Sequence, residues 1–224
     1  DIPVIIITED SSDVSIRKAY DLGASDYINR PFDAKVVYRR VFNSIKLYDK
    51  QKRLISIVTN QLREKERSSQ VMITILSHIV EFRNGESGSH VIKINKITEM
   101  LLNQLVAISS KYKLSNEDIF LIATASSLHD IGKITIDNSI INKKGKLTTE
   151  EYEIMKKHTI AGYEILDNLK DFKDERLVQI AKEICRWHHE RYDGNGYPDK
   201  LKGDNIPISA QVVSIADAYD ALVS

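Results

Sequence analysis

The chain has 224 residues, which on a prior of roughly 150 residues per domain amounts to one domain and part of another. A single cysteine, Cys185, excludes a disulfide scaffold and fits a reducing compartment, so we expect a cytoplasmic protein. The 32 basic and 32 acidic residues cancel, which argues against binding to a nucleic-acid polymer or a membrane, and no apolar run approaches the roughly 18 residues of a membrane span. The 9 glycines and 4 prolines are about half of average usage and favour long helices over a turn-rich β-sandwich.

The first 33 residues are predicted to form an α/β segment. Residues 3–8 show the short, β-branched pattern of a buried parallel strand. A short helix is expected over residues 14–22, closed by Gly23, and a second strand over residues 26–29. Asp33 is suited to cap the helix that follows it.

Residues 34–67 contain no glycine or proline and are predicted to form a long linker helix. Val41, Tyr48, Ile55 and Leu62 recur every seven residues, as in a coiled coil, but the companion positions are partly polar. Two interpretations stay open. The helix joins two copies in a parallel homodimer, or it packs on neighbours within its own chain.

Residues 68–224 are predicted to be helical, which makes the protein mainly α. Helices are expected over residues 68–83, 90–111, 115–129, 174–190 and 209–223, with one more beginning at residue 148. Capping boxes mark two of these starts, Ser115 with Asp118 and Thr148 with Glu151. A loop rich in glycine and proline separates the last two helices.

Most of the six histidines lie beside acidic residues at the ends of expected helices. Neutral imidazole and carboxylate are good ligands for divalent iron, manganese, zinc or cobalt. Residues four apart share a helical face, and consecutive residues diverge by about 100°, so adjacent pairs can reach different ions. Each element also has an ordinary explanation, such as a solvated helix end or a half-buried histidine. Their clustering nevertheless favours a metal site, with candidates Glu86, His90, His129, Asp130, His188, His189 and Asp217.

Five motifs follow one another in this part of the chain: RNGESGSH (83–90), HDIGK (129–133), a single His158, HHERYDGNGYP (188–198) and IADAYDAL (215–222). In this order they resemble the HD-GYP family, a branch of the HD metal-dependent phosphohydrolases. The resemblance covers residues 68–224 and implies a helical domain that hydrolyses cyclic di-GMP with two or three metal ions, often iron or manganese.

The resemblance also implies a role for each matching residue. Lys133 corresponds to the lysine that contacts the substrate phosphate, and Gly196 and Tyr197 to the loop that lines the substrate pocket. The implied catalytic residues are Asp130 and Lys133. Glu86 and His90 match the pair that completes the site in members with a third ion. The full set of implied metal ligands is Glu86, His90, His129, Asp130, His158, His188, His189 and Asp217.

Departures from the family pattern occur at two places. Asn84 and Ser87 replace residues that support the site, which affects the groups around the ligands. The family's basic substrate-binding residues would fall beyond Ser224, so we expect the domain to continue past this end.

The first 33 residues resemble the C-terminal part of a response-regulator receiver domain, through PVIIIT and AYDLGASDYINRPF. Thr8 and Tyr27 match the receiver's switch residues, whereas Arg30 stands where that family has lysine, and the phosphoacceptor segment is absent. The chain also begins at Asp1 without methionine, so we expect the true N-terminus to lie further upstream.

The sequence therefore predicts a metal-dependent cyclic di-GMP phosphodiesterase of a bacterial two-component system, producing linear pGpG, GMP or both. The alternative is a catalytically silent module that binds a cyclic dinucleotide or a protein and signals through the linker helix. A third hypothesis is hydrolysis of a different phosphoester, such as another cyclic dinucleotide.

Overall fold

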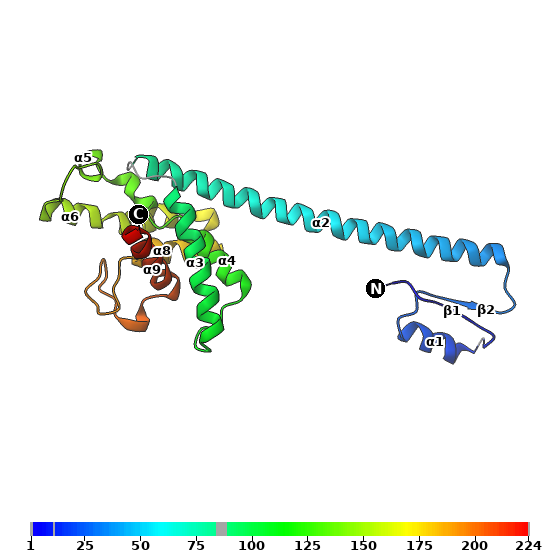
Figure 1. Ribbon diagram of the computed structural model, residues 1–224. Helices are drawn as coiled ribbons and strands as arrows, with labels where there is room; N and C mark the ends of the chain where they lie inside the picture. The colour runs from blue at the N-terminus through cyan, green and yellow to red at the C-terminus, as the bar shows by residue number, and fades with distance from the viewer. Residues whose placement is uncertain (1, 11, 84–88, 224) are drawn as a thin grey trace. The chain divides into compact units, whose positions relative to one another are not determined.

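A computed structural model describes residues 2–10, 12–83 and 89–223 of the chain. It divides into two compact units, Asp1–Arg67 and Ser68–Ser224, which are described separately. The labels used below are those of Figure 1. In the described part of the chain, no helix combines the length and apolar character required to cross a membrane.

The first unit contains a two-stranded parallel sheet with one helix between its strands. Strand β1 (Ile5–Thr8) pairs with β2 (Asp26–Asn29) in the register Ile5 to Asp26 and Thr8 to Asn29. Helix α1 (Asp13–Asp21) is capped by Ser12, whose side chain accepts a hydrogen bond from a backbone amide of the first turn. The strands and helix expected for this segment are confirmed within one or two residues.

Helix α2 (Ala34–Arg83) continues through both units as one element of 50 residues. The sequence predicted a new helix at Ser68, and this boundary is wrong. Serine lowers helix propensity by only a few tenths of a kcal/mol, and no glycine or proline interrupts the backbone there. In its second half, α2 buries Ser77, Val80 and Glu81.

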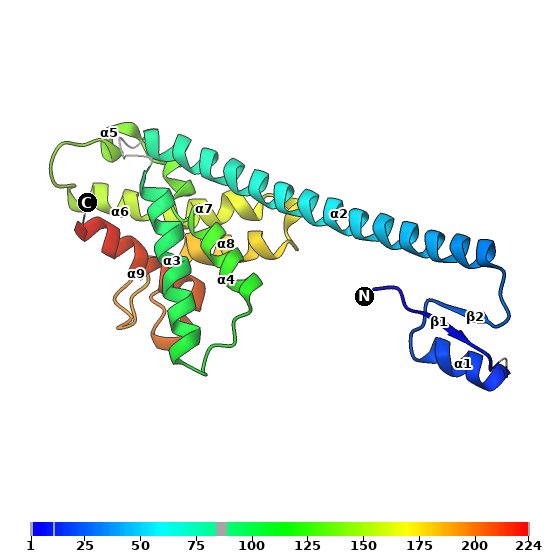
Figure 2. The ribbon, with the colours of Figure 1, turned by 45° about the vertical axis from the view of Figure 1, so that its right-hand side comes forward.

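The second unit is a bundle of helices around one core. Helix α3 (Ser89–Ile108) packs against α4 (Asn116–Ser126) and α9 (Ile208–Val223), and α8 (Arg176–Trp187) packs against α4, α7 (His158–Asp167) and α9. Figures 1 and 2 show α3, α4, α8 and α9 side by side. The core includes Ile94, Leu102, Ile184, Val213 and Ala216, all fully buried.

Short elements connect these helices: the 3-10 helices η1 (Ile131–Thr135), η2 (Lys170–Phe172) and η3 (Gly203–Asn205), and the helices α5 (Asn138–Ile141) and α6 (Thr149–Lys156). Both predicted capping boxes are present, at Ser115 and Thr148. Helix α4 ends at Ser126, not near His129 as predicted. Residues 127–130 form turns, so His129 and Asp130 lie outside the helix.

Candidate metal centre

The described metal-ligand candidates lie in two neighbouring groups in the second unit. They come from α3, the turn after α4, the start of α7, the end of α8, and α9. In each group, one donor atom of every member lies within 4.8 Å of the others. Glu86 lies outside the described residues. The first group is Asp130, His158, His188 and His189, and the second group is His90, His129 and Asp217.

The first group is centred on Asp130. Its Oδ1 lies 3.3 Å from Nε2 of His158 and 3.8 Å from Nε2 of His188. These two nitrogens are 3.4 Å apart, and the ring of His189 meets that of His158 edge-on at 5.2 Å between centroids. His158 and His188 are each 1% exposed. Nitrogen and oxygen donors that converge this closely can hold a divalent metal ion.

The second group is more open to solvent. Oδ1 of Asp217 lies 3.5 Å from Nε2 of His90 and 3.9 Å from Nε2 of His129, and the Asp217 side chain is 26% exposed. Nε2 of His129 is also 3.3 Å from Oδ2 of Asp130. The two oxygens of Asp130 therefore face different groups.

Hydrogen bonds donated by Nδ1 fix the orientation of four imidazole rings. In His129, His158 and His188, Nδ1 lies 2.7–2.9 Å from a backbone carbonyl three or four residues earlier. A carbonyl oxygen can only accept, so Nδ1 carries the hydrogen and Nε2 is left to bind a metal. In His90, the carboxylate of Asp220 takes this place, 2.7 Å from Nδ1.

Burial and neighbouring charges set the protonation of the centre. Burial opposes a charge on His129, but the adjacent Asp130 carboxylate outweighs it and raises the pKa of His129 to about 9. Burial also favours neutral Asp130, yet His129 and Lys133 hold the pKa of Asp130 well below its usual range. Burial lowers the pKa of His188 strongly and that of His189 to about 3. Ionised Asp130 and neutral His188 and His189 are in the states that bind metal, whereas His129 releases a proton when an ion takes its place at Nε2.

Two atoms in the centre are buried with no hydrogen-bond partner among the described residues, Nε2 of His129 and Oδ1 of Asp130. A buried polar atom without a partner costs about 1–3 kcal/mol. A divalent cation would satisfy an imidazole nitrogen and a carboxylate oxygen together. The residues present therefore fit a metal ion, and the centre can bind one.

A close backbone approach places His158 beside Asp130. A Cβ atom on Gly132 would lie 1.9 Å from the carbonyl oxygen of His158 and 2.5 Å from the amide nitrogen of Gly162. Any side chain at residue 132 would force η1 away from α7. The glycine of the HDIGK motif is thus required by packing.

A cavity of about 770 Å³ borders the first group. Lys133, His158, His189 and Tyr197 are among its lining residues. Nζ of Lys133 lies 2.7 Å from Oδ2 of Asp130, which places its positive charge at the edge of the metal centre. The ring of Tyr197 stacks on that of His189, with centroids 4.8 Å apart and planes 29° apart.

Tyr197 lies in a segment that we call the Tyr197 loop (residues 194–201). The backbone amide of Tyr197 donates to the carbonyl of His189 at 3.2 Å. Gly196 is buried and also lines the cavity, and a Cβ atom there would lie 2.5 Å from Cα of Glu190. Burial raises the pKa of Tyr197, so its phenol stays neutral. The Tyr197 loop thus packs directly against the backbone of His189 and Glu190.

Sequence reasoning missed Asp220. This residue is 3% exposed, and besides His90 it contacts Nζ of Lys93 at 3.2 Å. A signal was present, because Asp220 follows Asp217 by three residues and so shares its helical face.

Residues 55–224, which include the whole second unit and a preceding part of α2, match a family model described as HD domain. Across its whole length, the chain is 33% identical to "Cyclic di-GMP phosphodiesterase response regulator RpfG" of Xanthomonas campestris pv. campestris and covers 58% of that protein. Across 99% of its length, it is 34% identical to "Probable cyclic di-GMP phosphodiesterase" of Vibrio cholerae and covers 53% of it. Across 73% of its length, it is 41% identical to "3'3'-cGAMP-specific phosphodiesterase 2" of Vibrio cholerae and covers 29% of it. The chain therefore spans little more than half the length of the first two relatives.

Proposed function

Because the chain belongs to the HD domain family, we propose that it is a metal-dependent phosphodiesterase that hydrolyses cyclic di-GMP. One observation carries this proposal: two ligand groups meet at Asp130 beside a cavity that Lys133 and Tyr197 also line. The names of two relatives that match essentially the whole chain support the substrate.

We assign one ion to each ligand group, with Asp130 between them. Glu86, four residues before His90, is the proposed additional ligand of a third ion. Imidazole and carboxylate donors suit iron or manganese. Such ions, when bound, supply Lewis acidity towards a phosphate and make a water molecule more acidic. The proposed ligands are Glu86, His90, His129, Asp130, His158, His188, His189 and Asp217.

The proposed catalytic residues are Asp130 and Lys133. Asp130 holds the two groups in register through its two oxygens. The Lys133 ammonium, at the edge of the cavity, attracts the substrate phosphate and stabilises negative charge that develops on its oxygens. Tyr197 and Gly196 form a wall against which the nucleotide lies, with the Tyr197 ring as the stacking surface.

We extend the proposal to the whole chain. Residues 1–33 are the C-terminal part of a receiver domain, residues 34–67 are the linker part of helix α2, which joins two copies in a homodimer, and residues 68–224 are the catalytic domain. One relative is named a response regulator, which supports this order. The proposed location is the cytoplasm, and the proposed product is linear pGpG, GMP or both.

The test is anaerobic metal analysis combined with product analysis. After reconstitution with Fe(II) or Mn(II), we expect at least two ions per chain and conversion of cyclic di-GMP to pGpG or GMP. Fewer than two ions, with no turnover under these conditions, would contradict the proposal. Tight binding of intact cyclic di-GMP without turnover would instead favour a silent sensor.

The relative named for 3'3'-cGAMP makes that cyclic dinucleotide a second candidate substrate. Turnover of cyclic di-GMP, 3'3'-cGAMP and a linear dinucleotide under the same conditions separates the candidates. A ratio of kcat/KM that favours 3'3'-cGAMP would replace the first assignment.

A further inference from the structure

Residues 186–190, at the end of α8, carry both metal-ligand candidates and residues that contact the Tyr197 loop. His188 and His189 belong to the first ligand group, whereas Arg186, Trp187 and Glu190 contact the Tyr197 loop. None of these last three residues belongs to the ligand groups, and of the three only Glu190 also lines the cavity.

Asp199 is the point at which this network meets the loop. Its carboxylate accepts two hydrogen bonds from the Arg186 guanidinium, at 2.7 and 2.9 Å, and one from the Trp187 indole nitrogen, at 2.8 Å. A paired guanidinium–carboxylate contact of this kind fixes orientation as well as distance.

Glu190 fixes the backbone of the same segment. Its side chain is buried. Its two carboxylate oxygens accept hydrogen bonds from the backbone amides of Asp199, at 2.7 Å, and Leu201, at 3.0 Å. On the other side, the amide of Tyr197 donates to the carbonyl of His189. Tyr197 is therefore anchored through its own amide on one side, and the chain is anchored again two residues further on, at Asp199.

We propose that Asp199 is a positioning residue that ties the Tyr197 loop to the last turn of α8, and so sets the wall of the substrate cavity in register with the metal ligands. Asp199 touches neither ligand group in the described contacts. It acts through Tyr197 and Gly196, whose place against His189 it maintains. This inference rests on the proposed function for its substrate.

The test compares Asp199→Ala with wild-type full-length protein. Hydrogen bonds to charged groups are strong enough that loss of this anchor raises KM for cyclic di-GMP about tenfold. We expect kcat to stay within about twofold, because the ligand groups are intact. Metal content and hydrolysis of bis(p-nitrophenyl) phosphate, a small diester that needs only the metal centre, stay unchanged.

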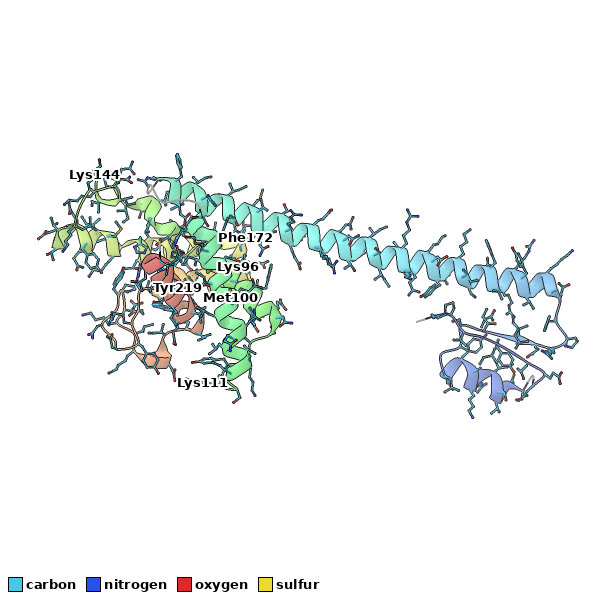
Figure 3. All side chains as sticks on the ribbon, viewed as in Figure 1. Lys96, Met100, Lys111, Lys144, Phe172 and Tyr219 are labelled. Atoms are coloured by element: carbon cyan, nitrogen blue, oxygen red, sulfur yellow. The ribbon has the colours of Figure 1, made fainter. Side chains whose placement is uncertain are left out.

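Asp204→Ala is the matched control. Asp204, in η3, also lies between α8 and α9 in the sequence and pairs with a basic side chain, Lys111, at 2.8 Å. Both side chains of this pair are exposed, and Figure 3 labels Lys111, just beyond the end of α3. Its replacement leaves KM unchanged. Asp199→Asn keeps an acceptor oxygen for Trp187 and part of the Arg186 contact. Its KM should therefore lie between those of the wild-type protein and Asp199→Ala. In an Arg186→Ala background, Asp199→Ala has a smaller effect, because the two residues share one interaction.

Hydrogen exchange of residues 194–201 decides the point without any substrate. Faster exchange of this segment in Asp199→Ala, with unchanged exchange in α8, supports the proposal. Equal exchange, or an equal KM in a protein that turns over cyclic di-GMP, overturns it. A wild-type protein that cleaves the small diester but no cyclic dinucleotide contradicts the proposed function alone, and the exchange result still decides the role of Asp199.

Discussion

The two ligand groups differ in what holds their histidines. In the first group, His158 and His188 rest on backbone carbonyls and are buried. In the second, His129 has the same kind of anchor, but His90 depends on the side chain of Asp220. No single side-chain substitution removes a backbone carbonyl, whereas one substitution removes Asp220. A single substitution can therefore release His90 of the second group from its partner, but it cannot remove the carbonyls that hold His158 and His188 of the first group.

Asp130→Ala should have the largest effect, because it removes the residue on which the two groups meet. Its loss takes an oxygen from both groups and the 2.7 Å partner of Lys133. We expect turnover to fall by about 10³-fold or more, together with loss of bound metal. Metal analysis and initial rates on the same preparation check this.

The matched control is Asp171→Ala, at an exposed aspartate in η2. It should keep both metal and activity. An Asp130→Ala protein that keeps full metal content and full turnover would show that the two groups do not depend on this carboxylate.

Gly132→Ala tests the backbone anchoring of the first group. The added methyl meets the backbone of His158 and Gly162, not a flexible side chain, so η1 and α7 must separate. We expect a loss of about 3 kcal/mol in the free energy of unfolding and a lower metal content. Chemical denaturation and metal analysis measure the two effects.

Gly145→Ala is the comparison for this variant. Gly145 has φ +113°, but a Cβ atom there would meet no heavy atom within 4 Å. Backbone strain alone costs about 1–3 kcal/mol, so stability falls while metal content holds. Equal metal loss in the two variants would mean that reduced stability, not the position of His158, controls the site.

The sequence correctly predicted the features that depend on residues close together in the chain. The capping boxes at Ser115 and Thr148 are present because each depends on residues three apart. The described ligand candidates come together in two groups. They could be predicted because each sits at a helix end or is a polar residue on an otherwise apolar helix. Asp220 was missed because its role exists only when α9 lies on α3. The Asp199 contacts depend on the path of a loop, which side-chain periodicity does not encode.

Asp220→Asn should have the smallest effect on turnover, and it should distinguish the two ligand groups most clearly by their metal affinity. The carboxylate holds Nδ1 of His90 at 2.7 Å, and an amide in its place is a weaker acceptor that no longer fixes the ring. Loss of such a partner typically lowers metal affinity by about 10–100-fold. We therefore expect one ion to be retained and a second to be lost on dialysis against a weak chelator, with turnover restored by excess metal. Lys93→Gln, which removes the cation 3.2 Å from Asp220 and keeps the carboxylate, should change the affinity much less. If Asp220→Asn releases all ions together, the two groups form one cooperative site, and the contrast in their anchoring has no consequence for metal binding.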